Sequence, residues 1–163
     1  MTKKPASLDE LKSRYESMIG FTPPKIAKRL ELGMRVDPDL VTALERTQVK
    51  LGESVRLNVT VRNKTDKGQP MTLARVEIPG GLMLQTWQLK ELREKGLIAF
   101  YETQPREVNL YLRELKPGES VQLPLDLLAF APGEFTSQAS TAYLYYTDEY
   151  KTWVNPTKVA VEP

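Results

Sequence analysis

Alternation of apolar and polar side chains with a period of two constrains the fold of this chain more than any other feature. It is clearest at residues 54–62, where every second side chain is apolar. Successive side chains of a β-strand point to opposite faces of a sheet, so this alternation predicts a strand with one buried face. Further predicted strands follow along the chain: 71–78, 97–103, 106–113, 120–129, 143–147 and 158–161.

Turns that contain glycine or proline separate these segments, at residues 79–81, 116–119 and 132–133. Short strands at this spacing favour an antiparallel β-sandwich of about eight strands. Pro124 lies inside the segment 120–129. Because proline has no backbone N–H to donate to a neighbouring strand, Pro124 predicts an edge position for this strand.

One segment, residues 86–95, has a helical pattern instead. We expect Trp87, Leu89 and Leu92 to face inward and the charged residues between them to lie in solvent. Trp87 and Trp153 are both interpreted as anchors of the core. Two residues of the kind that begin and end helices flank the segment, Thr86 and Gly96. The sequence therefore predicts one helix that crosses between strands.

The first 45 residues have a helical period. Ser7 and Glu10 have the spacing of a capping box at the start of an apolar series with helical intervals. A second helical pattern follows, and then a predicted helical turn from Asp37 to Leu44, where Pro38 stands at the first helical position. We expect a helical N-terminal extension at residues 1–45 and a β-sandwich domain at 46–163.

The chain of 163 residues contains no histidine and no cysteine. These absences remove the usual general base near neutral pH, the commonest metal ligand, thiolate nucleophiles, disulfides and nearly all zinc sites. A net charge of +2 is too small to indicate a nucleic-acid or anionic-membrane partner. No apolar run reaches membrane-spanning length, and no apolar signal-peptide core follows the basic N-terminus.

Ser137, Ser140 and Thr141 are the hydroxyl residues that a nucleophilic enzyme would use. Without histidine the base would have to be a lysine or a carboxylate, and no serine–lysine motif of the hydrolase type is present. We interpret the three residues as turn hydroxyls before a strand. The sequence therefore predicts no catalytic residue, no cofactor and no enzyme activity.

Asp148 and Glu149 form an acidic corner beside three tyrosines, Tyr145, Tyr146 and Tyr150. Adjacent carboxylates in a loop can hold calcium together with backbone carbonyls. A solvated β-turn is the other interpretation, and it is the one we favour. We predict no metal site, while calcium at this corner stays open.

In the order and type of its residues, the region 46–161 resembles the C-terminal receptor-binding domain of the alpha-2-macroglobulin family, most closely its bacterial branch. Four segments carry the resemblance, in family order: TQVKLGESV at 47–55, VRNKTDKGQPM at 61–71, IPGGL at 78–82 and YLYYTDE at 143–149. The resemblance implies an antiparallel β-sandwich with a single crossover helix.

The resemblance also implies a function. Family members are large protease inhibitors, many of which capture the protease through an internal thioester formed between a cysteine and a glutamine. The receptor-binding domain holds none of that chemistry, and a chain without cysteine cannot form a thioester. The resemblance thus implies a non-catalytic protein-binding module whose partner is a thioester-type macroglobulin domain or a receptor, in the periplasm or outside the cell.

Residue type and the resemblance together predict the binding surface. In animal members two lysines of the helix contact the receptor; Lys90 aligns with the second of them, while Thr86, which is not basic, lies near the first. Tyrosine, tryptophan and arginine dominate binding energies where they meet a partner. The predicted binding residues are Trp87, Lys90, Arg93, Glu94, Tyr145, Tyr146, Asp148, Glu149 and Tyr150.

Two alternatives remain. Residues 14–24 are similar to the helical opening of carboxymuconolactone decarboxylase-like proteins. One alternative is therefore that the chain is a helical remnant of such an enzyme. The Cys-x-x-Cys and histidine of the redox members are absent, so no activity is implied. The other alternative is a small self-associating structural domain, whose extension adds a helix to a neighbour's groove. The residues of that helix are Leu11, Tyr15, Met18 and Ile19.

Overall fold

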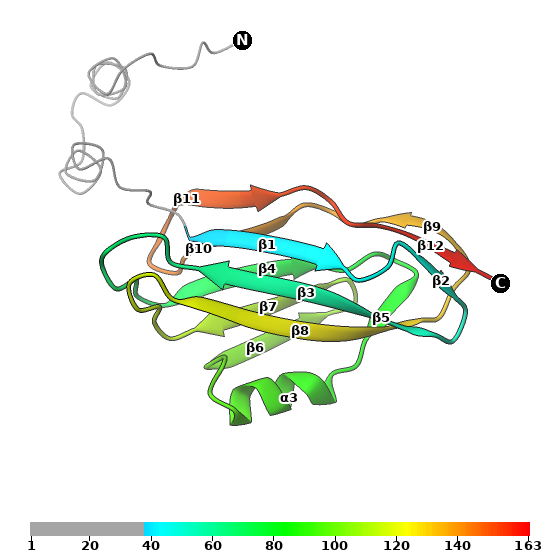
Figure 1. Ribbon diagram of the computed structural model, residues 1–163, viewed down its shortest axis with the longest axis horizontal. Helices are drawn as coiled ribbons and strands as arrows, with labels where there is room; N and C mark the ends of the chain where they lie inside the picture. The colour runs from blue at the N-terminus through cyan, green and yellow to red at the C-terminus, as the bar shows by residue number, and fades with distance from the viewer. Residues whose placement is uncertain (1–37) are drawn as a thin grey trace, which may run out of the picture. The chain divides into compact units, whose positions relative to one another are not determined.

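The computed structural model describes residues 38–163, apart from the side chains of 147–150. The described residues belong to one compact unit, Asp37–Pro163. They contain one helix and twelve strands, and the strands form three sheets (Figure 1). The predicted helices before residue 37 and the similarity at 14–24 lie outside the described residues.

Two large sheets pack face to face as a sandwich (Figure 1). The four-stranded sheet has the order β1 (Asp39–Leu44), β3 (Ser54–Arg62), β8 (Ser120–Ala129), β5 (Leu82–Leu84). The five-stranded sheet has the order β11 (Thr147–Val154), β10 (Ser140–Leu144), β4 (Thr72–Glu77), β7 (Glu107–Leu112), β6 (Phe100–Gln104). Every neighbouring pair in both sheets is antiparallel. The predicted antiparallel β-sandwich is therefore confirmed.

A third sheet, β2 (Gln48–Lys50), β12 (Lys158–Glu162) and β9 (Gly133–Thr136), lies at one end of the sandwich. Here β2 and β12 pair in parallel. Short strands of this kind are too brief to show alternation. For that reason the sequence does not predict β2, β5 or β9. Together with the longer strands β1 and β11, which were also missed, they raise the number within residues 38–163 to twelve, where about eight were predicted.

The inner faces of the two large sheets form one hydrophobic core. The alternation predicted for β3 is confirmed, because its inward side chains are all at most 1% exposed: Val55, Leu57, Val59 and Val61. Side chains of β7 and β8 meet them with the same period: Val108, Leu110, Leu112, Leu123, Leu125 and Leu127. Burial of each leucine or valine side chain contributes about 1.5–3 kcal/mol.

Helix α3 (Trp87–Glu94) lies beside β6 and β8 and covers one open side of the sandwich (Figure 1). Leu89 and Leu92 join the core, as predicted. The prediction for Trp87 is wrong, because its side chain is 59% exposed. Residues two positions apart on an α-helix point about 200° away from each other, so Trp87 cannot face inward together with Leu89. No helix within residues 38–163 has the length and apolar character needed to cross a membrane.

Two other predictions about single residues are also wrong. Trp153 is 65% exposed, because it alternates along β11 with the half-buried Thr152 and Val154. Thr86 precedes α3 but makes no side-chain capping hydrogen bond. Gly96 does follow the helix with a φ of 74°, the left-handed conformation that favours glycine after a helix.

The predicted helical turn at residues 37–44 is wrong, because Asp39–Leu44 forms strand β1. The spacing of Leu40, Val41 and Leu44 fits a helical turn, but Leu40, Thr42 and Leu44 also fit a period of two. The register with β3 places Leu40 opposite Val61 and Leu44 opposite Leu57. Pairing with the long strand β3 decides in favour of the strand, and the sheet therefore begins before residue 46.

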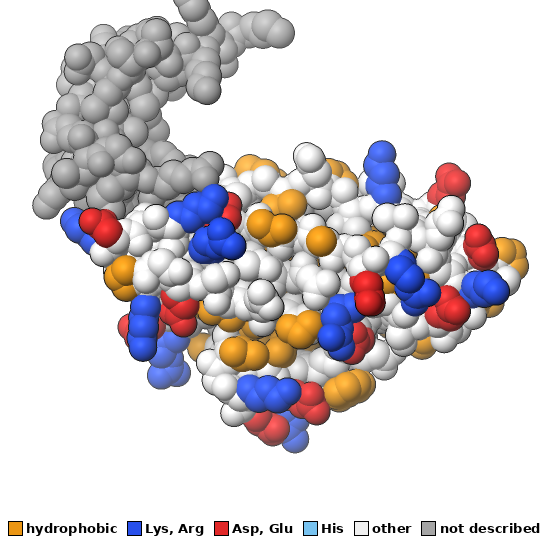
Figure 2. Space-filling view, in the orientation of Figure 1, with side chains coloured by type: hydrophobic (Ala, Val, Ile, Leu, Met, Phe, Trp, Pro, Cys, Tyr) orange, Lys and Arg blue, Asp and Glu red, His pale blue; other side chains and the backbone are white. Residues whose placement is uncertain are grey.

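The outer face of the four-stranded sheet carries few hydrophobic side chains. Figure 2 shows this face, with side chains in its middle that are mostly neither charged nor hydrophobic, and charged side chains around the edge and on α3. Arg56 and Asp126 form an ion pair across β3 and β8, with Nε and Oδ1 2.8 Å apart. This hydrogen bond with Arg56 holds the pKa of Asp126 below its ordinary value.

Asn63 joins two loops at the end of the sandwich. Its side chain is fully buried, and Nδ2 donates hydrogen bonds to the carbonyls of Lys67 at 2.7 Å, Leu115 at 3.1 Å and Lys116 at 3.1 Å. Oδ1 accepts from the backbone N–H of Thr65 at 2.9 Å and from its hydroxyl at 2.6 Å. The amide thus clamps the β3–β4 loop onto the β7–β8 turn.

Replacement of Asn63 by alanine tests this clamp. The change leaves the N–H of Thr65 without its partner and takes one of two donors from each of the three carbonyls. We therefore expect Asn63→Ala to lower the free energy of unfolding by about 2–4 kcal/mol. Asn58→Ala is the matched control, since Asn58 lies exposed on the same strand. Equilibrium unfolding in urea gives both values, and equal losses would refute the clamp.

Candidate functional site

Three predicted binding residues, Trp87, Lys90 and Glu94, lie on the solvent side of α3. Lys90 Nζ lies 3.9 Å from Glu94 Oε1, one helical turn further on. Both side chains are more than 60% exposed, and ion pairs of this kind stabilise a helix by only about 0.3–0.5 kcal/mol. Lys90 and Glu94 are therefore free to change partner when another protein approaches.

A buried amide holds α3 against the four-stranded sheet. Gln88 donates from Nε2 to the carbonyl of Asp126 at 2.8 Å, and its Oε1 accepts the N–H of Asp126 at 2.6 Å. Strand β5 pairs with β8 only at residues 127–129. The Gln88 side chain thus continues the strand pairing by one residue. The sequence analysis did not identify Gln88, because a glutamine in an amphipathic helix is typical of the solvent face.

Pro124 lies two residues before Asp126 on β8, so its nitrogen faces the same side as the Asp126 N–H. No strand pairs with β8 on that side at residue 124. The predicted edge position of Pro124 is confirmed for this part of the strand, although β8 pairs with β3 along its whole length on the other side.

Arg93 turns away from the solvent side of α3 and toward β6. Its guanidinium carbon lies 5.7 Å from the ring centroid of Tyr101, within the range of a cation–π interaction. Tyr101 packs against the core. Arg93 therefore lies beside the edge of the five-stranded sheet, while it remains exposed to solvent.

From this edge a continuous series of ring contacts crosses the five-stranded sheet. The centroid distances are 6.5 Å for Phe100–Tyr101, 5.6 Å for Phe100–Tyr111, 5.9 Å for Tyr111–Tyr145 and 5.1 Å for Tyr145–Tyr146. We call these five residues the aromatic strip. Phe100, Tyr145 and Tyr146 are 50%, 47% and 77% exposed. The strip connects Arg93 of the helix with the predicted binding residues Tyr145 and Tyr146.

Strand register explains how residues distant in sequence meet in the strip. Phe100 of β6 lies opposite Tyr111 of β7, which lies opposite Leu73 of β4. Leu73 in turn lies opposite Tyr143 of β10, and the Lys151 ammonium lies 4.7 Å from the Tyr143 ring centroid. An aromatic or apolar row therefore crosses four strands of the outer face and ends beside a cation.

The sequence analysis missed Phe100, Tyr101 and Tyr111. A signal for Tyr111 was present, because it lies on the polar side of the predicted alternation together with Asn109 and Arg113. An aromatic side chain at such a position is expected on the outer face of a sheet. The contact of Tyr111 with Tyr145 depends on the order of strands in the sheet, which the alternation does not contain.

The pKa of the Tyr111 hydroxyl is raised by its surroundings. Its hydroxyl donates a hydrogen bond of 2.9 Å to Oε2 of Glu102. Burial of the phenol, followed by this bond to Glu102, raises the pKa of Tyr111 to about 12. The hydroxyl thus stays protonated at neutral pH and fixes the ring in the middle of the strip.

The acidic corner differs from its prediction in one respect. The turn between β10 and β11 is at Tyr145 and Tyr146, and Asp148 and Glu149 follow in strand β11 rather than in a loop. The register between the two strands shifts at Tyr143 and Leu144, which moves the turn toward the N-terminus. The side chains of Asp148, Glu149 and Tyr150 lie outside the described part, so their roles stay predictions.

The three hydroxyl residues have structural partners or buried positions. The Ser140 hydroxyl accepts the N–H of Glu77 at 2.9 Å, and the Ser137 hydroxyl accepts the N–H of Thr157 at 2.9 Å. Thr141 is 3% exposed. Ser140 and Thr141 lie within β10 rather than before it. Among the side chains described, no group of three or more carboxylates has the geometry to hold a metal ion.

Removal of the Gln88 amide tests how α3 is held. Gln88→Met keeps the length of the side chain but leaves the N–H and C=O of Asp126 without partners. We expect the free energy of unfolding to fall by about 1–2 kcal/mol and the Asp126 amide to exchange its hydrogen faster. Gln85→Met, one turn earlier, is the control. Unchanged exchange at Asp126 in Gln88→Met would show that Gln88 does not hold the helix.

The raised pKa of Tyr111 predicts a loss of stability at alkaline pH. The unfolded chain releases this proton near the ordinary value of 10.0, whereas the folded protein retains it up to about 12. The stabilisation is therefore complete below pH 10 and is lost as the pH rises to about 12. Tyr111→Phe removes this titration, so its free energy of unfolding should fall less than that of the parent over the same window.

Urea unfolding at several pH values measures this difference. Tyr146→Phe is the control, since Tyr146 is largely exposed and should follow the parent. Parallel pH dependence of the parent and Tyr111→Phe would contradict the assignment of the raised pKa to Tyr111.

No family model matches the sequence, and no curated protein matches it. Solved structures do match the fold. Native alpha-2-macroglobulin from Escherichia coli, spanning domain MG7 to the C-terminus, matches with a TM-score of 0.64 and 15% identity, over 79% of this chain and 24% of that one.

Two further structures match in the same way. The cryo-EM reconstruction of native Escherichia coli alpha-2-macroglobulin has a TM-score of 0.62 and 14% identity, over 77% of this chain. Salmonella alpha-2-macroglobulin reacted with methylamine has a TM-score of 0.60 and 17% identity, over 78%. This chain covers 10% of each. The described residues thus have the fold of a segment of bacterial alpha-2-macroglobulin, as the sequence resemblance predicts.

Proposed function

We propose that this domain is a non-catalytic protein-binding module of the alpha-2-macroglobulin receptor-binding type. The likeness of its fold to bacterial alpha-2-macroglobulin supports the type of domain. The observation that carries the proposal is the aromatic strip, because it joins the two surfaces that the sequence predicts for binding, the helix at Arg93 and the turn at Tyr145 and Tyr146.

The chemistry of the strip suits a protein partner. Tyrosine combines a large apolar ring with a hydroxyl that stays solvated at the rim of an interface. Aromatic residues and arginine are enriched in protein interfaces, while lysine and glutamate are depleted in their centres. Phe100 and Tyr145 each leave about half of the side chain exposed. Their rings therefore offer apolar area that a partner can bury without any rearrangement of the sheet.

The proposed partner is a thioester-type macroglobulin domain or a receptor, and the proposed location is the periplasm or the outside of the cell. A chain without cysteine has to leave the thioester to its partner. Lys90 and Glu94 would contribute charges at the edge of the interface, where ion pairs influence the association rate more than the affinity.

A role without catalysis agrees with the hydroxyl residues. The two serines that are the obvious nucleophiles accept backbone hydrogen bonds that hold β10 and its preceding loop in place. Their contribution is therefore to the structure that carries the turn at Tyr145 and Tyr146.

The test is capture of partners by the full chain from periplasmic extract, followed by affinity measurement with the partner identified. We expect a thioester-containing macroglobulin or one defined receptor. The double variant Tyr145→Ala/Tyr146→Ala should weaken its binding at least tenfold, because aromatic residues at the centre of an interface are the usual energetic hot spots. Trp87→Ala/Lys90→Ala should weaken it as well.

Phe130→Ala is the matched control, since Phe130 is 51% exposed and makes none of the ring contacts of the strip. Unchanged affinity of both double variants would refute the proposed surface. Failure to capture any partner would refute the proposal of a separate partner. A change of oligomeric state in the double variants would instead identify the strip as a contact between copies of this chain.

A further inference from the structure

A groove lies at the end of the sandwich where the β3–β4 loop, the β7–β8 turn and the β10–β11 turn meet. Its volume is about 560 Å³. The lining residues that bear on its chemistry are Gln69, Pro70, Met71, Arg113, Lys116 and Tyr146. Asn63 holds two of these three connections together, so the walls of the groove are fixed before any ligand arrives.

A buried acceptor without a partner lines this groove. Gln69 is 6% exposed, and its Oε1 has no hydrogen-bond partner within residues 38–163. Its backbone is paired in both directions with Leu115, at 2.8 and 3.0 Å, so the residue cannot move out into solvent. Buried polar atoms in proteins nearly always have a partner. Because Oε1 itself is buried, a ligand N–H in the groove would supply the missing partner only after the Gln69 side chain turns toward the groove.

Cations without an ion pair lie beside this acceptor. Within the described residues, Arg113 and Lys116 line the groove and neither side chain has a carboxylate partner. Glu119 is engaged elsewhere, because its Oε2 accepts the backbone N–H of Lys116 at 2.7 Å. Glu114 is the single carboxylate of the lining. The guanidinium of an arginine can bind a carboxylate through two parallel hydrogen bonds.

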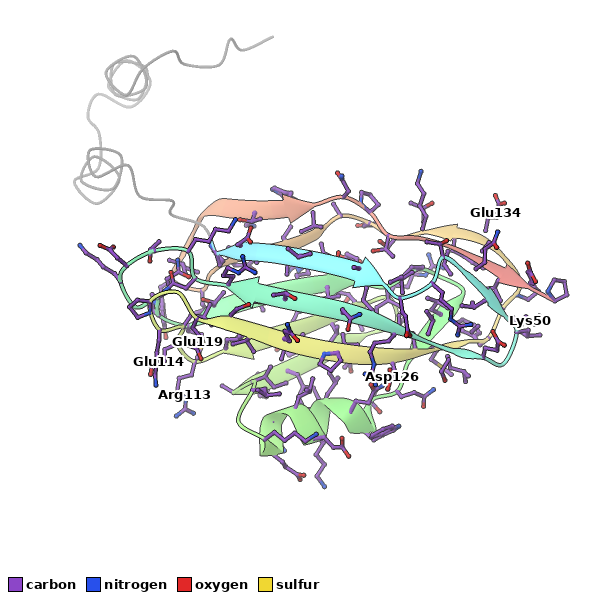
Figure 3. The ribbon with its side chains drawn as sticks, in the orientation of Figure 1. Lys50, Arg113, Glu114, Glu119, Asp126 and Glu134 are labelled. Atoms are coloured by element: carbon purple, nitrogen blue, oxygen red, sulfur yellow. The ribbon has the colours of Figure 1, made fainter. Side chains whose placement is uncertain are left out.

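A second hollow of about 470 Å³ adjoins the groove and shares Arg113 and Glu114 with it. Arg93 of α3 lines its far side. Figure 3 shows Arg113, Glu114 and Glu119 together at this end of the sandwich, with Lys50 and Glu134 at the opposite end. Arg113 therefore stands between two hollows, and a ligand of extended shape can pass over it from one to the other.

The remaining wall of the groove is apolar and stiff. Pro70 and Pro117 line it together with Met71 and the ring of Tyr146. Tyr146 is 77% exposed, and its ring is held edge-on against Tyr145 at a centroid distance of 5.1 Å. Such a wall offers contact to an apolar side chain next to the charged groups.

We propose that this groove binds an extended peptide segment with acidic side chains. Carboxylates of the peptide pair with Arg113 and Lys116, and an apolar side chain lies against Met71 and Tyr146. The Gln69 side chain turns toward the groove, so that its Oε1 accepts a peptide N–H. The site goes beyond the proposed function. The groove shares only Tyr146 with the aromatic strip. It would recognise its ligand by charge rather than by aromatic contact.

Fluorescence anisotropy with the full chain tests the proposal. The probe is a labelled peptide composed of glutamate, leucine and tyrosine, and the matched probe has glutamine in place of each glutamate. We expect the acidic peptide to bind at least tenfold more tightly than the neutral one, and to weaken as salt is raised from roughly 0.05 to 0.5 M because the charges are partly exposed. Free glutarate should compete only weakly. Equal binding of the two peptides would overturn the proposal, and competition by glutarate as strong as by the peptide would reassign the site to small carboxylates.

Variants locate the site. Arg113→Gln/Lys116→Gln should weaken binding at least tenfold, and Gln69→Met should weaken it several-fold without loss of fold. Lys50→Gln, at the opposite end of the sandwich (Figure 3), removes a positive charge away from the groove and should bind as the parent does. An equal loss in Lys50→Gln would show non-specific charge attraction and overturn the proposal.

Lys90→Gln separates this site from the proposed function, because Lys90 lies on α3 and does not line the groove. This variant should retain peptide binding even where partner capture is lost. Amide chemical shifts that change at residues 68, 69, 71, 113–116 and 146 on addition of the peptide would support the site independently. Changes confined to α3 would overturn it.

Discussion

Burial of the alternating side chains of β3 against β7 and β8 is the constraint on which the rest of the structure depends. A slip of one residue in either sheet would exchange its inner and outer faces, so the core fixes the register of every long strand. The same register decides which side chains face outward. Phe100 and Tyr111 meet on the outer face, in one row with Leu73 and Tyr143, because Val108 and Leu110 are required inside. The proposed binding surface is thus a direct consequence of how the core is packed.

Side-chain amides complete the sandwich where strand pairing ends. Gln88 takes the place of a missing strand beside Asp126, and Asn63 binds the loops at the end of β3. Both side chains are buried, and in each the amide nitrogen donates and the amide oxygen accepts hydrogen bonds. Gln69 differs, because its oxygen lacks a partner although its backbone is fully paired. Asn109 Oδ1 also lacks a partner, but of these two unsatisfied amides only Gln69 lines the groove.

The sequence determines strands and helix where the pattern is long and local. The alternation in β3 and the helical period around Leu89 and Leu92 were sufficient to predict this strand and the helix α3. The resemblance to alpha-2-macroglobulin predicted the β-sandwich with a single helix. Trp87 and Trp153 were predicted to be buried from residue type alone. The position of Trp87 on its helix relative to Leu89, and the alternation of side chains along β11 at Trp153, place both side chains outside. β1 was ambiguous because its apolar spacing fits two periods. The aromatic strip, the Asn63 clamp and the Gln88 contact join residues distant in sequence, so no local pattern contains them.

The open side of β8 has a consequence for how this domain behaves at high concentration. An unpaired strand edge recruits other strands through its free N–H and C=O groups, and this is a common route to aggregation. Here the edge offers no continuous set of donors: Pro124 has none, and the donor of Asp126 is occupied by Gln88. At these two positions an incoming strand would find a hydrogen-bond donor only by displacing Gln88, and with it α3. Around Pro124 and Asp126 the sheet therefore resists the addition of a strand, even though no strand covers it there.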